Sequence, residues 1–437
     1  MKTFTIETLG CKVNEYESAF YTSLLEEHGY RQAKSDEKAD VIIINTCTVT
    51  NTAAAKSRRK ISRLKRENPH AFVVVVGCYA QVVEQEERDS LQADLLIGAS
   101  HKNELVDLIE KAQNTHEPHQ KDFVENSRDL TEFESMPIGV FEGQHRAFLK
   151  IQDGCNQFCT YCQIPLARGF ERSQIPSEVV SSAQKLAQNG HLEIVLTGIH
   201  TGRYHFRETD LCDLLELLLE QTPEQVCYRL SSIEITEVND RILDLMAKNP
   251  RILPHLHIPL QAGDNRTLKR MNRPYTVEEF IARIEEIRAK IPNISISTDV
   301  ICGFVQESDD EFETTKKTIE ACQFSFLHVF PYSRRKGTAA DRMTGFVDGN
   351  IAKERTDQLL ELSKTLRQHD MERFMHTQVL IEREDVHHPN WYLGYTSQYH
   401  PATIYSEVPL KGRLNVKIDK IENGRYVVSH EAENETI

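Results

Sequence analysis

The amino-acid sequence predicts an α/β protein of three parts: an N-terminal parallel α/β sandwich, a central partial barrel of six βα units, and a small C-terminal antiparallel β-barrel. Strand-like and helix-like segments alternate over residues 1–115 and again from Arg146 to about residue 335. From about His376 the pattern changes to short alternating strands. A chain of 437 residues is also too long for one ordinary core, so two or three domains are expected.

The N-terminal part contains near-continuous apolar strands with helices between them. Such strands are buried on both faces, which is typical of a parallel sheet covered by helices on each side. The expected strands are Thr3–Thr8, Val41–Asn45, Phe72–Val76 and Leu95–Ile97, and the expected helices are Glu15–Glu27, Thr52–Glu67, Tyr79–Ser90 and Lys102–Ala112. Residues 1–115 are therefore predicted to form one domain, followed by a polar and acidic linker over residues 116–142.

The central part, residues 143–372, has six strand-like segments, which are too few for a closed eight-stranded barrel. The expected strands are Ala147–Gln152, Ile194–Thr197, Cys227–Leu230, Leu256–Ile258, Ile294–Ile301 and Phe326–Phe330, and a charged helix follows at residues 351–373. A partial barrel fits this number of strands. Residues 373–437 contain the four short segments that predict the C-terminal β-barrel, namely Val379–Glu382, Ala402–Tyr405, Leu414–Ile421 and Tyr426–Ser429.

The composition, 39% hydrophobic and 27% charged, is that of an ordinary globular protein. No stretch approaches the roughly 18 apolar residues of a membrane helix, so contact with a membrane is not expected. The first residues lead into a polar–apolar alternation instead of a signal-peptide core, so a cytoplasmic location is expected. The net charge of −14 argues against nonspecific binding of nucleic acid by the whole surface, but it leaves a local basic patch open.

The strongest motif is Cys155-x3-Cys159-x2-Cys162, in a polar loop after the first strand of the predicted barrel. Three thiolates at this spacing can hold three corners of a [4Fe–4S] cluster and leave the fourth iron open. Zinc is the alternative, but a structural zinc site has four ligands, usually from two paired loops, and the chain contains no second Cys-x2-Cys. Because a histidine from elsewhere could complete a zinc site, this alternative stays open.

Three further cysteines are dispersed along the N-terminal part. Cys11, Cys47 and Cys78 each follow one of its first three expected strands by two or three residues. Because ligands in an open parallel sheet bind beyond the carboxyl ends of the strands, these thiols should converge at one edge. One such cysteine would be ordinary packing, but three in phase predict a second cluster site. The other four cysteines are predicted to be packing residues: Cys212, Cys227, Cys302 and Cys322.

The clustered motif resembles the signature of the radical S-adenosylmethionine (radical-SAM) enzymes. The longer string Gly154–Pro165, followed by Arg168-Gly169 and preceded by the three dispersed cysteines, is similar to the methylthiotransferases, which carry two [4Fe–4S] clusters. This resemblance spans nearly the whole chain. It implies a radical-SAM core of (β/α)6 type and a C-terminal barrel like the RNA-binding TRAM module. The clustered cysteines would then hold the cluster that binds S-adenosylmethionine, and the dispersed cysteines would hold an auxiliary cluster.

Strings around the first-domain cysteines resemble one substrate branch of that family. Thr8–Asn14 and Asn45–Thr50 look like the branch that acts on N6-threonylcarbamoyladenosine at position 37 of tRNA, and Thr197–Tyr204 and Phe330–Gly337 agree with it. The resemblance implies that a deoxyadenosyl radical takes the hydrogen from C2 of the adenine. The auxiliary cluster then supplies sulfur, and a second cofactor molecule supplies the methyl group. Because the clusters carry this chemistry, no side chain is singled out as catalytic.

The same resemblance implies two partners, the anticodon stem-loop of tRNA and an electron donor such as flavodoxin or ferredoxin. Two alternatives stay open. One keeps the chemistry but changes the substrate to isopentenyladenosine of tRNA or to a ribosomal protein. The other is a metal-containing RNA-binding protein that is not an enzyme.

Basic residues in two segments are candidates for RNA contact. The first set recurs at helical spacing and would form one stripe, although a solvated helix face is as good an interpretation: Lys56, Arg59, Lys60 and Arg63. The second set, Lys411 and Arg413, lies in the C-terminal barrel. Tyr392, Tyr395 and Tyr426 of the same barrel are candidates for stacking on bases.

Other candidates surround the expected cofactor site. Gly198 and Gln261 follow barrel strands and are predicted to face S-adenosylmethionine. Lys150 and Arg168 flank the cysteine loop and could stabilise a carboxylate, with surface charge as the alternative. After Asp299–Phe304 the chain continues Val305-Gln306-Glu307-Ser308, where the family usually has Pro-Gly-Glu-Thr. Losing this proline and glycine is expected to loosen or reshape the turn.

Overall fold

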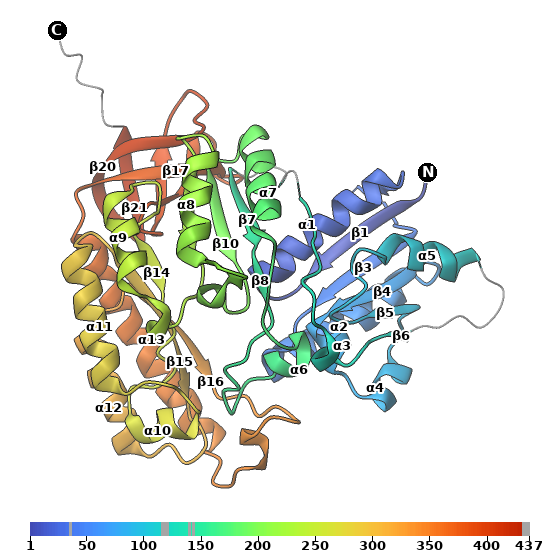
Figure 1. The fold of residues 1–437 in the computed structure, drawn as a ribbon, viewed down its shortest axis with the longest axis horizontal. Helices are drawn as coiled ribbons and strands as arrows, with labels where there is room; N and C mark the ends of the chain where they lie inside the picture. The colour runs from blue at the N-terminus through green and yellow to red at the C-terminus, as the bar shows by residue number, and fades with distance from the viewer. Residues whose placement is uncertain (35–36, 115–121, 139–140, 142–144, 431–437) are drawn as a thin grey trace.

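The computed structural model describes residues 1–34, 37–114, 122–138, 141 and 145–430. The three predicted parts follow one another along the chain: a sheet flanked by helices, a barrel-like core and a small closed barrel (Figure 1). The predicted fold class is therefore confirmed. In the described ranges, no helix is both long enough and apolar enough to cross a membrane.

The N-terminal part is a six-stranded parallel sheet in the order β2-β1-β3-β4-β5-β6. Four strands are close to those predicted, and two short edge strands were not predicted. The strands are β1 (Thr3–Thr8), β2 (Arg31–Gln32), β3 (Val41–Thr46), β4 (Phe72–Gly77), β5 (Leu95–Ile97) and β6 (Asp122–Phe123). Every residue of β3 is buried, because both faces of the sheet are covered by helices.

Each face of this sheet packs against its own pair of helices. Helices α1 (Lys12–Glu27) and α5 (Leu105–Asn114) share a core with alternate strand residues such as Ile43 and Val74. Helices α2 (Asn51–Glu67) and α3 (Cys78–Val82) cover the other face. The helix predicted over Tyr79–Ser90 is interrupted, because Val83 and Glu84 have extended backbone before α4 (Gln85–Ser90).

The described part of the predicted linker is packed against both neighbours. Strand β6 pairs with β5 through Phe123 and Ile97. Tyr16 of α1 donates a hydrogen bond to the carbonyl of Met136, and Met136 and Ile138 are buried in the main core. This segment therefore contributes a strand to the sheet and apolar side chains to the core.

The central part contains the six predicted strands as two three-stranded parallel sheets. One sheet consists of β7 (Arg146–Lys150), β10 (Glu193–Thr197) and β13 (Cys227–Leu230), and the other of β14 (His255–His257), β15 (Ser295–Cys302) and β16 (Phe326–Pro331). Bridges between Tyr228 and Ile252 and between Ser232 and His257 join the edges of the two sheets. The short strands β8 (Gln152–Asp153), β9 (Arg172–Ser173), β11 (His205–Phe206) and β12 (Thr209–Asp210) lie in the connections.

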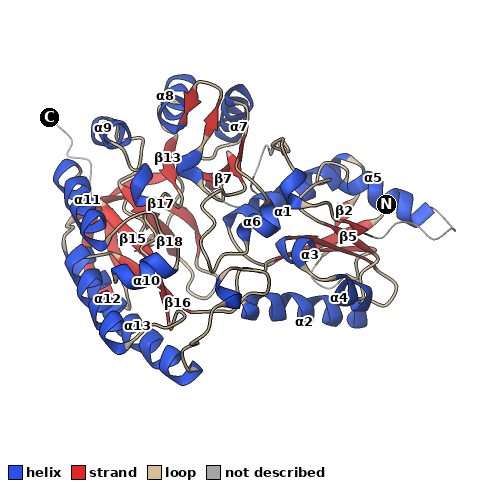
Figure 2. Cartoon of the chain, turned by 60° about the horizontal axis from the view of Figure 1, so that its bottom comes forward, coloured by secondary structure: helices blue, strands red, loops and turns tan. Residues whose placement is uncertain are grey.

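Helices surround the two central sheets on the outside, except for the short α6, which lies beside α1 and α3 at the boundary with the N-terminal part (Figure 2). The helices of this part are α6 (Ile164–Arg168), α7 (Pro176–Gln188), α8 (Leu211–Gln221), α9 (Asp240–Lys248), α10 (Asn265–Arg270), α11 (Val277–Lys290), α12 (Asp309–Cys322) and α13 (Gly349–Glu372). Several begin at capping boxes; in α12, for example, Ser308 accepts from the Glu311 amide while Glu311 accepts from the Ser308 amide. The four cysteines predicted to be packing residues are buried in these strands and helices.

The C-terminal part is a closed barrel of five strands in the order β17-β18-β19-β21-β20. They are β17 (His376–Glu384), β18 (Trp391–Thr396), β19 (Pro401–Tyr405), β20 (Arg413–Glu422) and β21 (Arg425–His430). Strand β18 was not predicted. Its inward-facing Gly394 interrupts the apolar alternation, and a Cβ there would lie 2.2 Å from the Leu380 carbonyl. Tyr392 and Tyr426 lie in the barrel core, so the prediction that they stack on bases is wrong.

This barrel docks against the amino ends of the central strands. Arg229 forms a buried ion pair with Glu193 (2.7 Å) and donates to the carbonyls of Thr396 and Ser397 in the β18–β19 turn. Arg413 lies 3.5 Å from the same Glu193, with 13% of its side chain exposed. This position at the domain interface does not fit the predicted contact of Arg413 with RNA.

Candidate active site

The loop that carries the clustered cysteines lies between β8 and α6, and two glycines determine its path. Gly154 has a φ of +76°, and a Cβ there would lie 1.8 Å from the Phe170 carbonyl oxygen. Gly169 has a φ of +73°, and a Cβ there would lie 2.0 Å from the Ser127 carbonyl oxygen. Because L side chains are strained at these angles and would overlap the neighbouring backbone, the close approach requires glycine at both positions.

The three sulfurs of this loop each have a nitrogen donor. The amide of Gln157 donates to Cys155 Sγ (3.4 Å), the amide of Ile164 donates to Cys162 Sγ (3.4 Å), and Arg273 Nη1 donates to Cys159 Sγ (3.2 Å). Burial, followed by the neighbouring thiols, raises the pKa of Cys162 to about 12. Closely grouped thiolates with N–H donors directed at sulfur are suited to an iron–sulfur cluster, so the residues fit this group.

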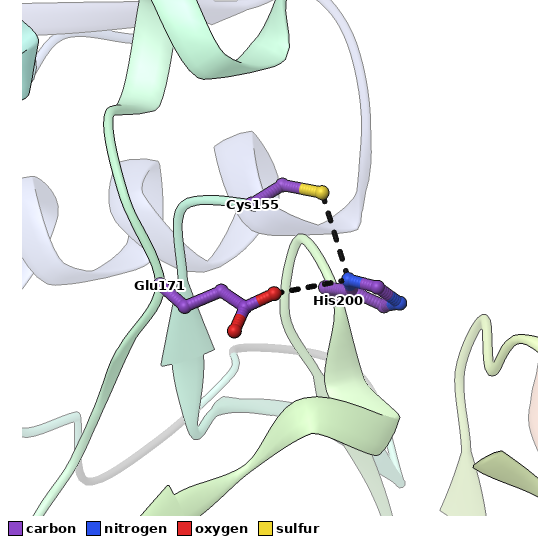
Figure 3. Close-up of side chains that lie close together, drawn as sticks. All are labelled: Cys155, Glu171 and His200. Atoms are coloured by element: carbon purple, nitrogen blue, oxygen red, sulfur yellow. Dashed lines mark hydrogen bonds and ion pairs between the residues drawn. The ribbon is translucent and has the colours of Figure 1, made fainter. Parts of the chain in front are cut away.

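A histidine lies beside this loop (Figure 3). The Nδ1 atom of His200 is 3.5 Å from Cys155 Sγ and 3.5 Å from a carboxylate oxygen of Glu171, and its Nε2 atom is 2.8 Å from Glu237. Donor atoms of Cys155, Glu171 and His200 lie within 4.8 Å of one another. This group contains only one of the three clustered thiols, so it is not the closed site with four ligands that the zinc alternative needs.

His200 was not among the predicted site residues. It lies two residues after Gly198, and its backbone amide donates to Gln152 Oε1 (2.7 Å). The Nε2 atom of the same Gln152 donates to the carbonyls of Asp153 and Gly154, which lead into the cysteine loop. A buried amide side chain thus ties the loop after β10 to the cysteine loop. The only signal in the sequence was the position of this string after a barrel strand.

The dispersed cysteines converge as their position after the strands predicted. Cys11 is the N-cap of α1, Cys78 is the first residue of α3, and Cys47 follows β3. Cys47 packs against the residue before Cys11, because a Cβ on Gly10 would lie 2.9 Å from Cys47 Cβ. Burial, followed by the neighbouring Cys78 and Cys11 thiols, raises the pKa of Cys47 to about 11. The three thiols therefore form a second group whose chemistry fits an iron–sulfur cluster.

A buried charge network joins the two cysteine groups. Arg168, at the end of α6, donates through Nε to Cys78 Sγ (3.1 Å) and through its other nitrogens to Glu17 and Asp153. Lys150 contacts Asp153 Oδ2 (2.6 Å) and Glu17 Oε1 (3.1 Å). Both cations are fully buried, so the surface-charge alternative for Lys150 and Arg168 is wrong. The carboxylates that they stabilise belong to this chain.

Gly198 follows β10 directly, and Gln261 lies four residues after the end of β14. A Cβ on Gly198 would lie 3.0 Å from the Gln152 carbonyl oxygen, so the chain passes closely there. Gln261 has a φ of +64° and donates its amide to the Asp299 carbonyl (2.9 Å). Their contact with S-adenosylmethionine stays a prediction.

The turn after β15 is held by hydrogen bonds to two neighbouring segments. The amide and the side chain of Gln306 donate to the carbonyls of Gly345 (2.8 Å) and Thr344 (2.9 Å). Arg270 donates to the carbonyl of the buried Val305 (3.1 Å). Hydrogen bonds to neighbouring segments therefore hold this turn where the family has proline, and the expectation that it is loosened or reshaped stays a prediction.

The predicted basic stripe lies on α2, on the side away from the buried Ala54, Ile61 and Leu64. Lys56, Arg59 and Arg63 are exposed, whereas Lys60 forms an ion pair with Glu7 (2.7 Å). Lys411 is exposed on the C-terminal barrel.

Comparisons with known proteins identify the family. Residues 3–98 match the model of the uncharacterized protein family UPF0004, and residues 149–319 match the radical SAM superfamily. The chain is 38% identical over 430 residues to the threonylcarbamoyladenosine tRNA methylthiotransferase MtaB of Bacillus subtilis, covering 97% of this chain and 95% of that one. It is 37% identical to the protein of the same name from Thermotoga maritima, covering 83% and 82%. The chain belongs to the radical-SAM methylthiotransferase family.

Within this family the chain lies in the MtaB-like branch, and it is an enzyme of the radical-SAM methylthiotransferase class. The tRNA-2-methylthio-N(6)-dimethylallyladenosine synthase of Dictyoglomus thermophilum is also similar, with 32% identity over 96% of each chain. Membership of the radical-SAM family implies one [4Fe–4S] cluster and S-adenosylmethionine, which the clustered cysteines suit.

Two solved structures share the fold. The radical S-adenosylmethionine methyltransferase TsrM from Kitasatospora setae gives a TM-score of 0.56 at 14% identity, over 78% of this chain and 77% of that one. The cobalamin-dependent S-adenosylmethionine radical enzyme OxsB gives a TM-score of 0.52 at 14% identity, over 84% and 56%. At this identity the likeness concerns the arrangement of strands and helices alone.

Proposed function

We propose that the protein is a tRNA methylthiotransferase that adds sulfur and a methyl group at C2 of N6-threonylcarbamoyladenosine at position 37. The observation that carries this proposal is the pair of cysteine groups joined by Arg168 and its buried carboxylate partners. The choice of base is supported by identities of 32–38% to five relatives named for threonylcarbamoyladenosine, the highest being 38%, against 31–32% to relatives named for dimethylallyladenosine.

The proposed cofactors are S-adenosylmethionine and two [4Fe–4S] clusters, one on each cysteine group. When bound, they supply reductive cleavage of S-adenosylmethionine and the sulfur and methyl groups of the product. The protein's own part is to hold these cofactors and to orient them. Arg273 donates to Cys159 Sγ, and Arg168 donates to Cys78 Sγ, so each cysteine group has a guanidinium beside it. Such donors stabilise charge on sulfur.

Arg335 positions the two domains relative to one another. It follows β16 and is buried, and it donates to Thr48 and Asn51 of the N-terminal part and to Gln163 of the cysteine loop. Thr48 follows Cys47 directly, and Gln163 follows Cys162. One side chain therefore ties residues next to both cysteine groups, which keeps their separation fixed while a substrate lies between them.

The proposed partners are the anticodon stem-loop of tRNA and an electron donor such as flavodoxin or ferredoxin. The exposed Lys56, Arg59 and Arg63 on α2, with Lys60 beside them and Lys411 on the C-terminal barrel, are proposed to contact phosphates. Such contacts position RNA without reading its sequence. Recognition of the base itself would then depend on the interior of the central barrel.

The test is anaerobic reconstitution followed by iron counting and mass analysis of tRNA nucleosides. We expect about eight irons per chain, falling by about four when Cys155, Cys159 and Cys162 become alanine. We also expect threonylcarbamoyladenosine in added tRNA to gain a methylthio group. About four irons in the unchanged protein would remove the second cluster. If the protein methylthiolated isopentenyladenosine alone, its substrate would be that base, and the proposal of threonylcarbamoyladenosine would be refuted.

A further inference from the structure

Polar side chains from two domains converge in the interior of the central barrel. Asp299 and His328 are on the neighbouring strands β15 and β16, and His257 is at the end of β14. Along β15, Asp299 alternates with the fully buried Thr298 and Val300, so its side chain is on the opposite face of the sheet from these residues. The N-terminal domain adds Lys12, the first residue of α1. We call Lys12, His257, Asp299 and His328 the lumen cluster.

The three strand residues of the lumen cluster contact one another and leave donor and acceptor atoms accessible. His257 Nε2 lies 3.2 Å from Asp299 Oδ1, and the His257 and His328 rings are 5.4 Å apart between centroids. Donor atoms of all three lie within 4.8 Å of one another. Asp299 retains 28% of its side-chain exposure and His328 is exposed, so a ligand in the lumen can reach both.

Lys12 enters the lumen without an anionic partner. Its Nζ atom lies 5.6 Å from the centroid of the Tyr399 ring. Tyr399 belongs to the β18–β19 turn of the C-terminal barrel, which contacts the amino ends of the central strands. Arg146 and Arg229 lie over the same ring at 5.4 and 4.8 Å, and each of them has a carboxylate within ion-pair distance. Among the residues that the structure describes, no carboxylate lies within that distance of Lys12. Its ammonium is therefore available to an anion from outside.

The charge of Lys12 acts on the lumen cluster. Burial raises the pKa of Asp299, but the hydrogen bond from His257 and the charges of His257, His328 and Lys12 lower it overall. Burial, followed by His257, lowers the pKa of His328, and Lys12 lowers it further while Asp299 opposes this. At neutral pH the cluster therefore presents an ionised carboxylate and a neutral imidazole beside Lys12.

We propose that the lumen cluster recognises the threonylcarbamoyl group of the substrate base, with Lys12 pairing with its carboxylate. Asp299 and His328 then bond its hydroxyl and carbamoyl groups. This inference rests on the proposed function and names the residues that select the base. Lys12 follows Cys11 directly, and C2 and C6 of adenine both flank N1. A substituent on N6 is thus on the same side of the base as C2, next to the dispersed cysteine group.

The chemistry of the cluster disfavours other occupants. An isopentenyl group offers no acceptor, so it would bury the ammonium of Lys12 without a partner, and sites built to bond polar groups reject such analogues strongly. A divalent cation on the two histidines and the aspartate is the second alternative. The carboxylate of Asp299 attracts a cation, but Lys12, Arg146 and Arg229 lie around the same Tyr399 ring and together repel it and attract an anion, so the substrate carboxylate is favoured.

The test measures binding and turnover of three anticodon stem-loop RNAs of one sequence with the reconstituted protein. Their adenosine 37 carries the threonylcarbamoyl group, its methyl ester, or no modification. We expect the unchanged protein to bind the carboxylate RNA about tenfold more tightly than the ester, as one charged contact provides. Lys12→Gln should bring this ratio to about one, whereas Lys12→Arg should retain most of it. Lys364→Gln, on the exposed surface of α13, is the control and should leave the ratio unchanged.

The outcomes separate this inference from the proposed function. If the unchanged protein methylthiolates the carboxylate RNA but Lys12→Gln keeps the tenfold ratio, the function stands and the role of Lys12 is refuted. If the unchanged protein methylthiolates neither the carboxylate RNA nor its ester, both proposals fail. The iron content of Lys12→Gln shows whether this variant retains the cluster on the neighbouring cysteine group. If Lys12→Gln does not fold, binding and turnover of the same RNAs are measured with His328→Ala instead. A stoichiometric divalent metal that His328→Ala removes would establish the cation site instead.

Discussion

Glu17 is the anion that three buried cations share. Arg168, Lys150 and Lys102 all contact its carboxylate, and its side chain is fully buried. Burial raises the pKa of Glu17, but the charges of these three cations outweigh it and hold the pKa well below its usual range. A carboxylate in this position is stable only because its partners are present, and the partners depend on it in return.

Replacing Glu17 by glutamine should therefore destabilise the protein strongly. The amide leaves three buried cations with Asp153 as their remaining carboxylate, and breaking a buried ion pair in this way costs about 3–5 kcal/mol. Equilibrium unfolding in urea measures this loss. Glu361→Gln is the matched control, because the Glu361–Lys364 pair is exposed and its loss should change stability by less than about 1 kcal/mol. A similar small effect for both variants would contradict the account of the network.

At the scale of single residues, the sequence predicted the cysteines better than the charges. Cys11, Cys47 and Cys78 could be brought together because parallel strands end at one edge, which depends on local pattern alone. The burial of Lys150 and Arg168 depends on Glu17, which is more than 130 residues away in the chain. No local pattern contains that partner, so a surface position was an equally good interpretation. For the same reason, the sequence did not predict that Lys12 and His328 belong to one cluster.

Among the elements, the cysteine loop depends most strongly on one glycine. Gly154→Ala places a Cβ 1.8 Å from the Phe170 carbonyl oxygen at a φ of +76°, so the backbone of β8 or β9 has to move. We expect the reconstituted variant to lose about four irons per chain, because the loop that holds Cys155 no longer closes. Gly349→Ala, at the start of α13, has nothing within 4 Å of the new Cβ and should retain all iron. An unchanged iron count in Gly154→Ala would contradict the assigned role of this turn.

Helix α13 holds the C-terminal barrel through a carboxylate in its last turn. Asp370 Oδ2 lies 2.8 Å from His400 Nε2, and Ser295 of β15 donates to the same oxygen. Burial raises the pKa of Asp370, but the hydrogen bonds of His400 and Ser295, with the charge of Arg373, lower it overall.

Since the folded-state pKa of Asp370 lies below its unfolded value, the stabilisation is complete above about pH 4 and is lost as the pH falls through the folded pKa. Asp370→Asn should therefore cost about 2 kcal/mol at pH 7, as hydrogen bonds to a charged group do. The difference between the two proteins should shrink steadily below pH 4. Urea unfolding at a series of pH values measures it, and a difference that grows toward acid pH would refute the assignment.

The elements themselves were largely predictable, and the exceptions have local causes. Helix starts such as Ser308 in α12 have recognisable capping boxes. Strand β18 escaped prediction because Gly394 occupies an inward position where the alternation needs an apolar residue. The interruption between α3 and α4 has no glycine or proline to mark it, so the sequence there reads as one helix.

At the scale of the whole molecule, Arg335 connects the N-terminal domain to the central core. Arg335→Gln removes the bonds to Thr48 and Asn51 while leaving every cysteine in place. We expect formation of methylthio product to fall about tenfold or more, because small misplacements of reacting groups are costly, while cleavage to 5′-deoxyadenosine stays within about twofold. The ratio of the two products in one assay gives this result.

The neighbouring Lys336→Gln serves as the control, since the Lys336–Glu84 pair is exposed. An equal fall of both products in Arg335→Gln would mean that Arg335 supports the cysteine loop alone and does not align the domains.

The order of the three parts was visible in the sequence, but their contacts were not. Residues 116–142 look like an interdomain linker because they are polar and acidic, yet Met136 and Ile138 are buried in the main core. The C-terminal barrel is likewise held against the central core by a hydrogen bond from Arg229 to the carbonyl of Ser397, which is 168 residues away in the chain. Such contacts depend on how domains are oriented, which local periodicity does not encode.

Helix α1 limits how the protein can be recombined with its relatives. Its buried Glu17 pairs with Lys150 and Arg168 of the central core, and Lys12 lies near Tyr399 of the C-terminal barrel. A chimera that imports the N-terminal domain of another family member would bring its own version of this helix to Lys150 and Arg168. Modular exchange should therefore succeed only when the crossover points carry α1 together with the cysteine loop. The two domains, although separate in fold, would be inherited as one unit.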